Sequence, residues 1–185
     1  MQKSKTNIVR MTVNAMLVAL YIVLSLPLMT INVGGLKFTF EHFPVVLSAV
    51  IFGPLEALVV GTLGELINQL TTFGITPTTI LWILPIAVRG ALVGVCYKLL
   101  KNKIQDLVSV KHSALFIIVC IASGLISSCL NTVALYVDSK LFGYYTYEMV
   151  FGVLLMRLVL SIITSVIIGI IITPVLYALK RARLV

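Results

Sequence analysis

The chain has 185 residues, of which 60% are hydrophobic and only 11% are charged, whereas about a quarter of the residues of a typical soluble domain are charged. This composition excludes an ordinary soluble fold, and the length allows one domain, residues 1–185. The 14 Lys and Arg residues outnumber the 6 Asp and Glu residues, but they flank long apolar runs, which is typical of a polytopic membrane protein and not of a nucleic-acid-binding protein.

The first apolar run follows a basic N-terminal segment, as in a secretory signal peptide. The run continues over residues 11–30 without a small-residue cleavage site, so we expect a first span that is retained. A helix of this length crosses about 30 Å of hydrocarbon. Residues 32–35 (NVGG) then interrupt the pattern and predict a flexible loop.

The next apolar stretch, residues 38–73, is too long for one crossing, and Gly53-Pro54 divides it near its middle. Three further apolar runs follow. Because unpaired backbone cannot face lipid, the pattern predicts an all-α integral membrane protein with six transmembrane helices. After the first span, the predicted spans are residues 40–52, 54–72, 80–99, 113–137 and 149–178.

Six crossings place both termini on the same side of the membrane. The basic residues support this number, because ten of the fourteen then lie on one face, which the positive-inside rule makes cytoplasmic. Five spans would separate the N-terminal basic cluster from the C-terminal one. The ten residues are Lys3, Lys5, Arg10, Lys98, Lys101, Lys103, Lys111, Lys180, Arg181 and Arg183.

Polar side chains inside the predicted spans are costly in hydrocarbon and by default mark function. On this topology, four helices carry polar groups roughly 9–14 Å below the outer surface, at 1.5 Å per residue. This shared level indicates a pocket that opens outward. The alternatives are structural: Glu65 pairs with an arginine, or asparagines form hydrogen bonds between helices. The polar residues are Glu65, Asn68, Gln69, Arg89, Asn131 and Arg157.

Two arginines against one carboxylate leave a surplus positive charge in this pocket. A guanidinium is planar and always charged and suits a carboxylate, so we expect an anionic ligand. Aromatic residues on the outer side, including Phe38 and Trp82, form a belt at the lipid interface or stack on a flat ring system. His42 and His112 lie at opposite membrane edges, and we assign them to the interface.

The available reactive groups argue against an enzyme. An intramembrane serine protease needs a histidine within the bilayer, and the sequence has neither a metal-ligand cluster nor a Gly-x-x-x-x-Gly-Lys nucleotide loop. We therefore expect no catalytic residue, no metal site and no cofactor. A proton-coupled carrier with Glu65 as the titrating acid remains an alternative, and without an internal repeat it would need a dimer.

Several motifs, together with the predicted topology, are similar to one family. They are Ala15-Met-Leu-Val-Ala19, the run from Phe43-Pro44 through Phe52-Gly53-Pro54 to Gly61-Thr-Leu-Gly64-Glu65, Arg89-Gly90, and Leu130-Asn131-Thr132. Over essentially its whole length the chain resembles the substrate-binding (S) components of energy-coupling factor (ECF) vitamin transporters. Arg89-Gly90 and the Asn131 motif are similar to the folate branch, and Glu65 stands where the family usually has Asp.

The resemblance implies a subunit in the plasma membrane of a bacterium that captures a vitamin outside the cell. Its implied partners are a transmembrane coupling subunit and two cytoplasmic ATPases. An anionic, ring-bearing vitamin such as folate ranks first and pantothenate second. The predicted ligand contacts are Arg89, Arg157, Asn131, Glu65, Asn68, Phe38 and Trp82, capped by the loop 32–40. The predicted docking residues are Asn14, Ala15 and Ala19, where small side chains permit close helix approach.

Overall fold

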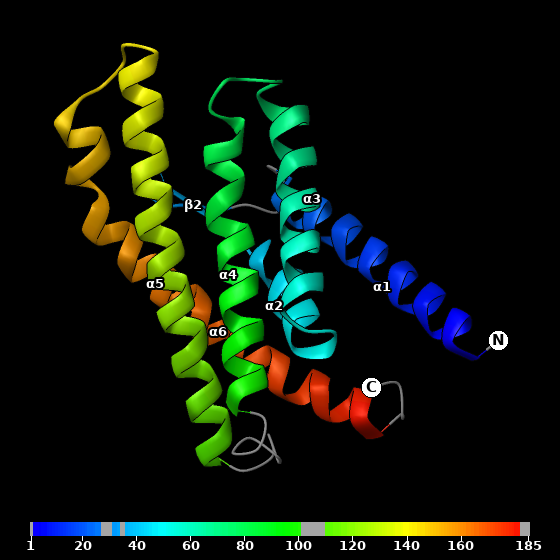
Figure 1. Ribbon diagram of the computed structural model, residues 1–185. Coiled ribbons are helices and arrows are strands. Elements are labelled where there is room, and N and C mark those ends of the chain that lie inside the picture. The colour runs from blue at the N-terminus through cyan, green and yellow to red at the C-terminus, as the bar shows by residue number, and fades with distance from the viewer. Residues whose placement is uncertain (1, 27–30, 34–35, 101–109, 182–185) are drawn as a thin grey trace.

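The computed structural model describes residues 2–26, 31–33, 36–100 and 110–181. Figure 1 shows a bundle of helices from which the N-terminal part of α1 diverges, with a short hairpin beside the bundle. The helices are α1 (Gln2–Ser25), α2 (His42–Ile51), α3 (Pro54–Thr72), α4 (Thr79–Leu100), α5 (Val110–Leu141) and α6 (Leu154–Arg181), and the hairpin strands are β1 (Ile31–Val33) and β2 (Leu36–Phe38). A π-helical turn, η2 (Glu148–Gly152), precedes α6.

The break between α2 and α3 occurs where the sequence predicts it. Gly53 has φ 108°, a left-handed conformation that favours glycine. Pro54 begins α3, where its missing N–H has no partner to lose. The chain therefore passes directly from α2 into α3 at this glycine, and the two helices pack against each other.

The all-helical character of the chain is confirmed, apart from the hairpin. By length and composition, four of the described helices are able to cross a membrane: those containing Ile8–Ser25, Thr79–Leu100, Ser113–Leu141 and Glu148–Leu176. The helix α2 has only 10 residues, and α3 carries several polar residues. Six full crossings and a cytoplasmic position of both termini therefore remain predictions.

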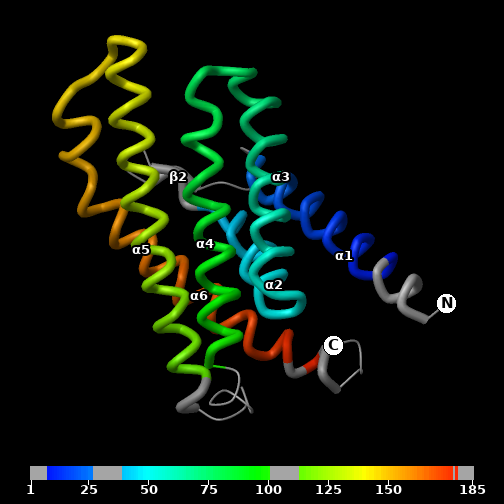
Figure 2. Tube along the Cα trace, viewed as in Figure 1, coloured from blue at the N-terminus to red at the C-terminus, as the bar shows by residue number. Residues whose placement is uncertain are grey.

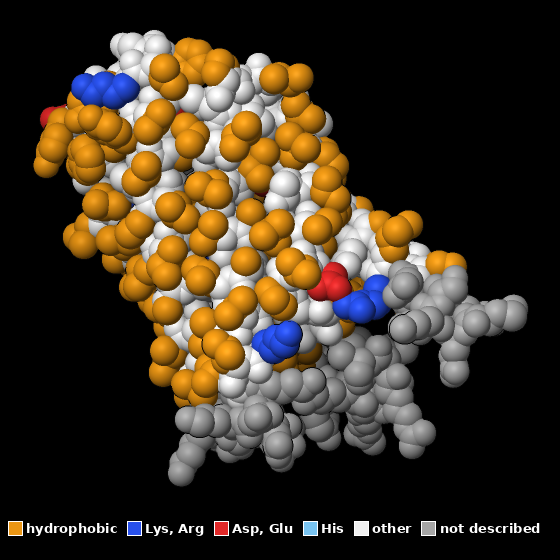
Figure 3. All heavy atoms as spheres, in the orientation of Figure 1, with side chains coloured by type: hydrophobic (Ala, Val, Ile, Leu, Met, Phe, Trp, Pro, Cys, Tyr) orange, Lys and Arg blue, Asp and Glu red, His pale blue; other side chains and the backbone are white. Residues whose placement is uncertain are grey.

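The outer surface of the bundle is consistent with a lipid environment. Figure 3 shows hydrophobic side chains over most of the visible face, with Lys and Arg side chains towards its ends. Large apolar residues such as Leu55, Ile80 and Leu155 are exposed on three different helices. A surface of this kind would aggregate in water, so its natural surroundings are apolar.

Three segments differ from the sequence-based prediction. The expected flexible loop contains an antiparallel hairpin in which Ile31 pairs with Phe38 and Val33 with Leu36, and Gly-Gly between two such runs is a known hairpin signal. The helix α1 begins at Gln2 instead of residue 11, because a helix can extend beyond its apolar segment. The end of the predicted first span, residues 27–30, lies outside the described residues. The helix α5 continues to Leu141.

Neighbouring helices approach each other most closely where a glycine of one faces the other. A Cβ on Gly94 would lie 2.5 Å from Pro54 Cα, and one on Gly90 would lie 2.9 Å from the Ala57 carbonyl oxygen. Gly90 and Gly94 of α4 therefore pack inside the bundle, against α3. Figure 2 shows α6 inclined to α5, and α6 packs along α5 and also contacts α2.

Candidate ligand-binding site

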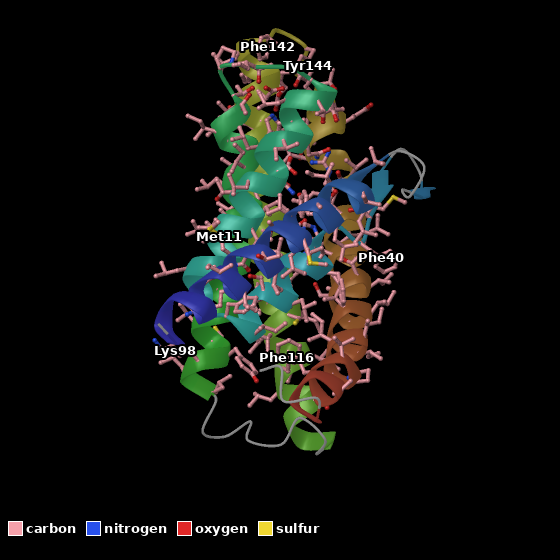
Figure 4. All side chains as sticks on the ribbon, turned by 90° about the vertical axis from the view of Figure 1, so that its right-hand side faces the viewer. Met11, Phe40, Lys98, Phe116, Phe142 and Tyr144 are labelled. Carbon is pink, nitrogen blue, oxygen red and sulfur yellow. The ribbon has the colours of Figure 1, made fainter. Side chains whose placement is uncertain are left out.

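A cavity of about 730 Å³ lies among α3, α4, α5 and α6, with residues near the start of α2 also contributing to its wall. Phe142 and Tyr144 line it, and Figure 4 shows both at one end of the molecule, with Lys98 towards the other end. Pockets for small organic ligands commonly measure about 300–1,000 Å³. The volume therefore suits a ligand of vitamin size.

Each of the four helices contributes a stripe of residues at helical spacing, i, i+3 or i+4, and i+7, as expected when one helix face meets a common space. The stripes are Glu65, Asn68, Gln69 and Thr72 on α3, Trp82, Ile86 and Arg89 on α4, Gly124, Ser127, Ser128, Asn131, Leu135 and Asp138 on α5, and Arg157, Leu160, Ser161 and Thr164 on α6.

The predicted polar contacts all line this one cavity. Glu65, Asn68, Arg89, Asn131, Arg157 and the aromatic Trp82 come from four helices and face the same space. Phe38 is in β2, and its side chain lies outside the part that the structure describes. The neighbouring Thr39 lines the cavity.

Arg89 is the deepest charge in the wall, with 1% of its surface exposed. Its Nη2 donates a hydrogen bond to Ser165 Oγ at 2.9 Å. A Cβ at Gly124 would lie 2.4 Å from this Ser165 Oγ, so the glycine leaves room for the hydroxyl that binds Arg89. Among the described residues, two buried side-chain nitrogens have no hydrogen-bond partner: Arg89 Nε and His42 Nδ1. Both residues line the cavity, and buried polar atoms of this kind normally have a partner.

Glu65 is held by three neutral donors. Its Oε2 accepts hydrogen bonds from Tyr21 Oη at 2.6 Å and from Asn68 Nδ2 at 3.2 Å, and its Oε1 accepts one from Gln69 Nε2 at 2.7 Å. Neither Arg89 nor Arg157 forms an ion pair with Glu65 within the described ranges. The alternative in which Glu65 locks helices together through an arginine is therefore wrong.

The prediction of a single carboxylate in the pocket is also wrong. Glu41 and Asp138 line the cavity as well. Asp138 accepts hydrogen bonds from Thr78 Oγ1 and Tyr144 Oη. Loss of hydration, together with the hydrogen bond to Asp138, raises the pKa of Tyr144 to about 12. In the described part of the chain, Asp138 forms no ion pair with either cavity arginine. Neither Glu65 nor Asp138 therefore neutralises the charge of these two guanidiniums.

Arg157 is less enclosed than Arg89. It is half-buried, and its Nη2 donates to the carbonyl oxygen of Met149, in the π-helical turn, at 3.5 Å. The aromatic residues in the cavity lining include Phe73, Trp82, Phe142 and Tyr144. The site thus combines cations, amides and rings.

Several site residues were missed from the sequence. Asp138 follows the predicted end of its span, and His42 was assigned to the interface; the structure places both in the cavity wall. The serines of α5 and α6 form helical stripes with Asn131 and Arg157, and this spacing was a usable signal. Within the described ranges, no cluster of His, Cys, Asp and Glu is arranged to hold a metal ion.

The predicted docking residues lie on α1, away from the cavity lining. Ala15 and Ala19 are exposed, and Asn14 Oδ1 accepts a hydrogen bond from Ser48 Oγ at 3.1 Å. Next to them, Arg10 forms an ion pair with Glu56. This pair ties α1 to the start of α3 and leaves the two alanines uncovered.

Comparison with known proteins supports one family. Residues 9–179 match the protein family described as ECF transporter, substrate-specific component. A solved structure described as "Structure and mechanism of the S component of a bacterial ECF transporter" has a similar fold, with a TM-score of 0.58 and 23% sequence identity over 94% of each chain. No curated protein matches the chain in sequence.

Proposed function

The chain belongs to the family of ECF transporter substrate-specific components, and from this premise we propose that it is the high-affinity vitamin-binding subunit of an ATP-driven importer in a bacterial plasma membrane. A member of this family is a transporter subunit and not an enzyme. The proposal adds the ligand, the contacts and the partners.

One observation supports the ligand class above all others: the buried Arg89 guanidinium borders the cavity with its Nε unpartnered. A buried charge is costly unless it is paired and hydrogen-bonded. A ligand carboxylate offers the planar acceptor pair that matches a guanidinium. Arg89 therefore binds the anionic group of the ligand, with Arg157 as the second cation.

The remaining wall favours a ligand with a ring system. Trp82 and Phe73 offer flat apolar faces, and Asn131, Asn68 and Gln69 offer amides for polar ring atoms. A cavity of about 730 Å³ suits folate better than the smaller pantothenate. Folate thus ranks first, with pantothenate second.

The proposed partners follow from the same family. A transmembrane coupling subunit would pack against α1 at Ala15 and Ala19, and two cytoplasmic ATPases would supply the energy. Small exposed side chains one helical turn apart permit close helix contact in lipid. Asn14 would border this surface through its bond to α2.

A proton-coupled carrier without ATPases is the second candidate. Glu65 would be its titrating acid, because it is a buried carboxylate at the cavity wall. Three neutral donors already hold both oxygens of this carboxylate in a fixed position. This arrangement favours a positioning role for Glu65 over a role in proton transport.

The proposed ligand is tested with the purified protein. We expect mass spectrometry of the denatured preparation to release a vitamin that carries a carboxylate, and titration of the emptied protein to show tighter binding of folate than of pantothenate. Tighter pantothenate binding would reverse the ranking. Binding of neither compound, with a neutral molecule released, would contradict the anionic-ligand proposal.

A further inference from the structure

The hydrogen bonds of Glu65 fix the orientation of two side-chain amides at the cavity wall. Asn68 Nδ2 and Gln69 Nε2 both point at the carboxylate, at 3.2 and 2.7 Å. Tyr21 Oη adds a third donor at 2.6 Å. Glu65 and Gln69 are each 7% exposed, so water competes little for these bonds.

The chemistry of a carboxylate dictates which amide atom remains for a ligand. An ionised carboxylate only accepts hydrogen bonds, while a carboxamide has an NH₂ group that donates and an oxygen that accepts. Because one N–H of each amide is bound to Glu65, the orientation of each amide is fixed and its oxygen is left over for the ligand. Asn68 Oδ1 accepts only a long bond from Thr72 at 3.5 Å, and no described residue donates to Gln69 Oε1.

We propose that Glu65 is a positioning residue, through which the cavity selects ligands that carry hydrogen-bond donors. By holding the NH₂ groups of Asn68 and Gln69, it presents their two oxygens to the cavity. The part of the ligand bound there carries adjacent N–H donors, such as a ring N–H beside an exocyclic amino group. This inference rests on the proposed vitamin-binding function of the same cavity.

The inference defines a ligand with two chemically different ends. One end is an anion that binds Arg89, and the other is a heterocycle with an N–H edge that binds the two amide oxygens. A heterocycle that offers acceptors at this edge would leave the two amide oxygens facing other acceptors with no hydrogen bond between them, and unpaired buried acceptors are costly. Such a compound is rejected.

The test uses two fragments that differ in one donor group. Isocytosine has an amino group next to its ring N–H, and 2-methylpyrimidin-4-one has a methyl group in place of the amino group. We expect the native protein, purified in detergent, to bind isocytosine about tenfold more tightly, since each hydrogen bond to a buried acceptor has roughly this effect. Protein-observed NMR measures both affinities, together with the side-chain amide signal of Gln69.

Two variants remove the positioning in different ways. In Glu65→Gln the new side chain has one acceptor instead of two, so one of the two amides becomes free to turn, and the preference for isocytosine should fall to about twofold or less. Gln69→Met removes the acceptor oxygen Oε1 while the side chain keeps a similar length, and it should have the same effect. Tyr21→Phe is the matched control: it removes a donor from the same carboxylate but leaves both amide bonds, so the preference should persist.

Each outcome decides the inference. Failure of isocytosine to bind the native protein, or an unchanged preference in both Glu65→Gln and Gln69→Met, would overturn it. Folate binding is measured on the same preparations. If folate binds but the fragments are not distinguished, the positioning role fails while the vitamin proposal stands; if the fragments are distinguished but neither vitamin binds, the choice of vitamin fails and the positioning role stands.

Discussion

At the scale of single residues, Arg89 and Arg157 differ in how much a ligand would change their surroundings. Arg89 is 1% exposed, and its Nη2 donates a hydrogen bond to Ser165 Oγ. Arg157 is half-buried and bonds a backbone carbonyl at 3.5 Å. Arg157 is open to water, so the proposed ligand carboxylate would stabilise Arg89 more.

Replacing Arg89 with Gln should therefore weaken folate binding by about 2–5 kcal/mol, the usual range for truncating one partner of a buried charge pair. Arg157→Gln should weaken it less. Isothermal titration of the purified variants measures both, and an analogue of folate without its carboxylates should lose little further affinity in Arg89→Gln. Arg10→Gln is the control, because Arg10 pairs with Glu56 outside the cavity. Native affinity in both cavity variants would assign these arginines a structural role.

Most of the polar residues of the site could be predicted from the sequence, because an ionisable or amide side chain in a long apolar run stands out. Their partners could not be predicted. Whether Glu65 bonds Arg89 or Tyr21 depends on the rotation of α1 and α4 about their axes, which hydropathy does not determine. Asp138 was missed because its helix continues to Leu141, beyond the apolar run.

At the scale of elements, α1 combines a buried face with an exposed one. Leu17 and Tyr21 are buried, and a Cβ on Gly64 would lie 2.7 Å from the Tyr21 ring. Ala15 and Ala19 are exposed. Ala19 is two residues from Tyr21, or about 200° around the helix at 3.6 residues per turn, so the proposed docking face and the packing face point in nearly opposite directions.

Bulky residues at the two alanines should block the partner without affecting the ligand. Ala15→Leu and Ala19→Leu hold a neighbouring helix away, and contact between helices in lipid depends on close packing. We expect loss of co-purification with the coupling subunit and loss of uptake in cells, with unchanged ligand affinity of the isolated protein. Ala122→Leu, an equal change at an exposed position of α5, should have no effect. Affinity that falls together with uptake would show that α1 supports the cavity instead.

The secondary structure of the bundle was largely predictable, since apolar length and Gly53-Pro54 locate the helices. The hairpin and the π-helical turn have no period that hydropathy detects in so few residues, and Gly-Gly is the one local signal for the hairpin. The hairpin strands have only three residues each, and their pairing depends on contacts between residues, not on alternation along a long strand.

At the scale of the whole molecule, the described residues form a candidate binding cavity but show no means of using energy. The cavity is lined by residues from α3 to α6, and the sequence has no nucleotide-binding loop. A lone chain with such a site can hold a ligand to equilibrium. Accumulation against a gradient needs coupling to an energy source, either the ATPases of a complex or a proton gradient acting through an acid such as Glu65.

Proteoliposomes separate these two possibilities. When they contain this chain alone, we expect radiolabelled folate to bind in a stoichiometric amount and not to accumulate inside under an imposed proton-motive force, because Glu65 is already bound by three neutral donors. Proteoliposomes that also contain the coupling subunit and the ATPases should accumulate folate only when ATP is present on the side of the membrane that carries the ATPases. Glu65→Gln in the lone chain is the matched control, since it removes the titrating acid and should leave the absence of accumulation unchanged. Concentrative uptake by the native lone chain that disappears in Glu65→Gln would establish the proton-coupled carrier and contradict the importer-subunit proposal.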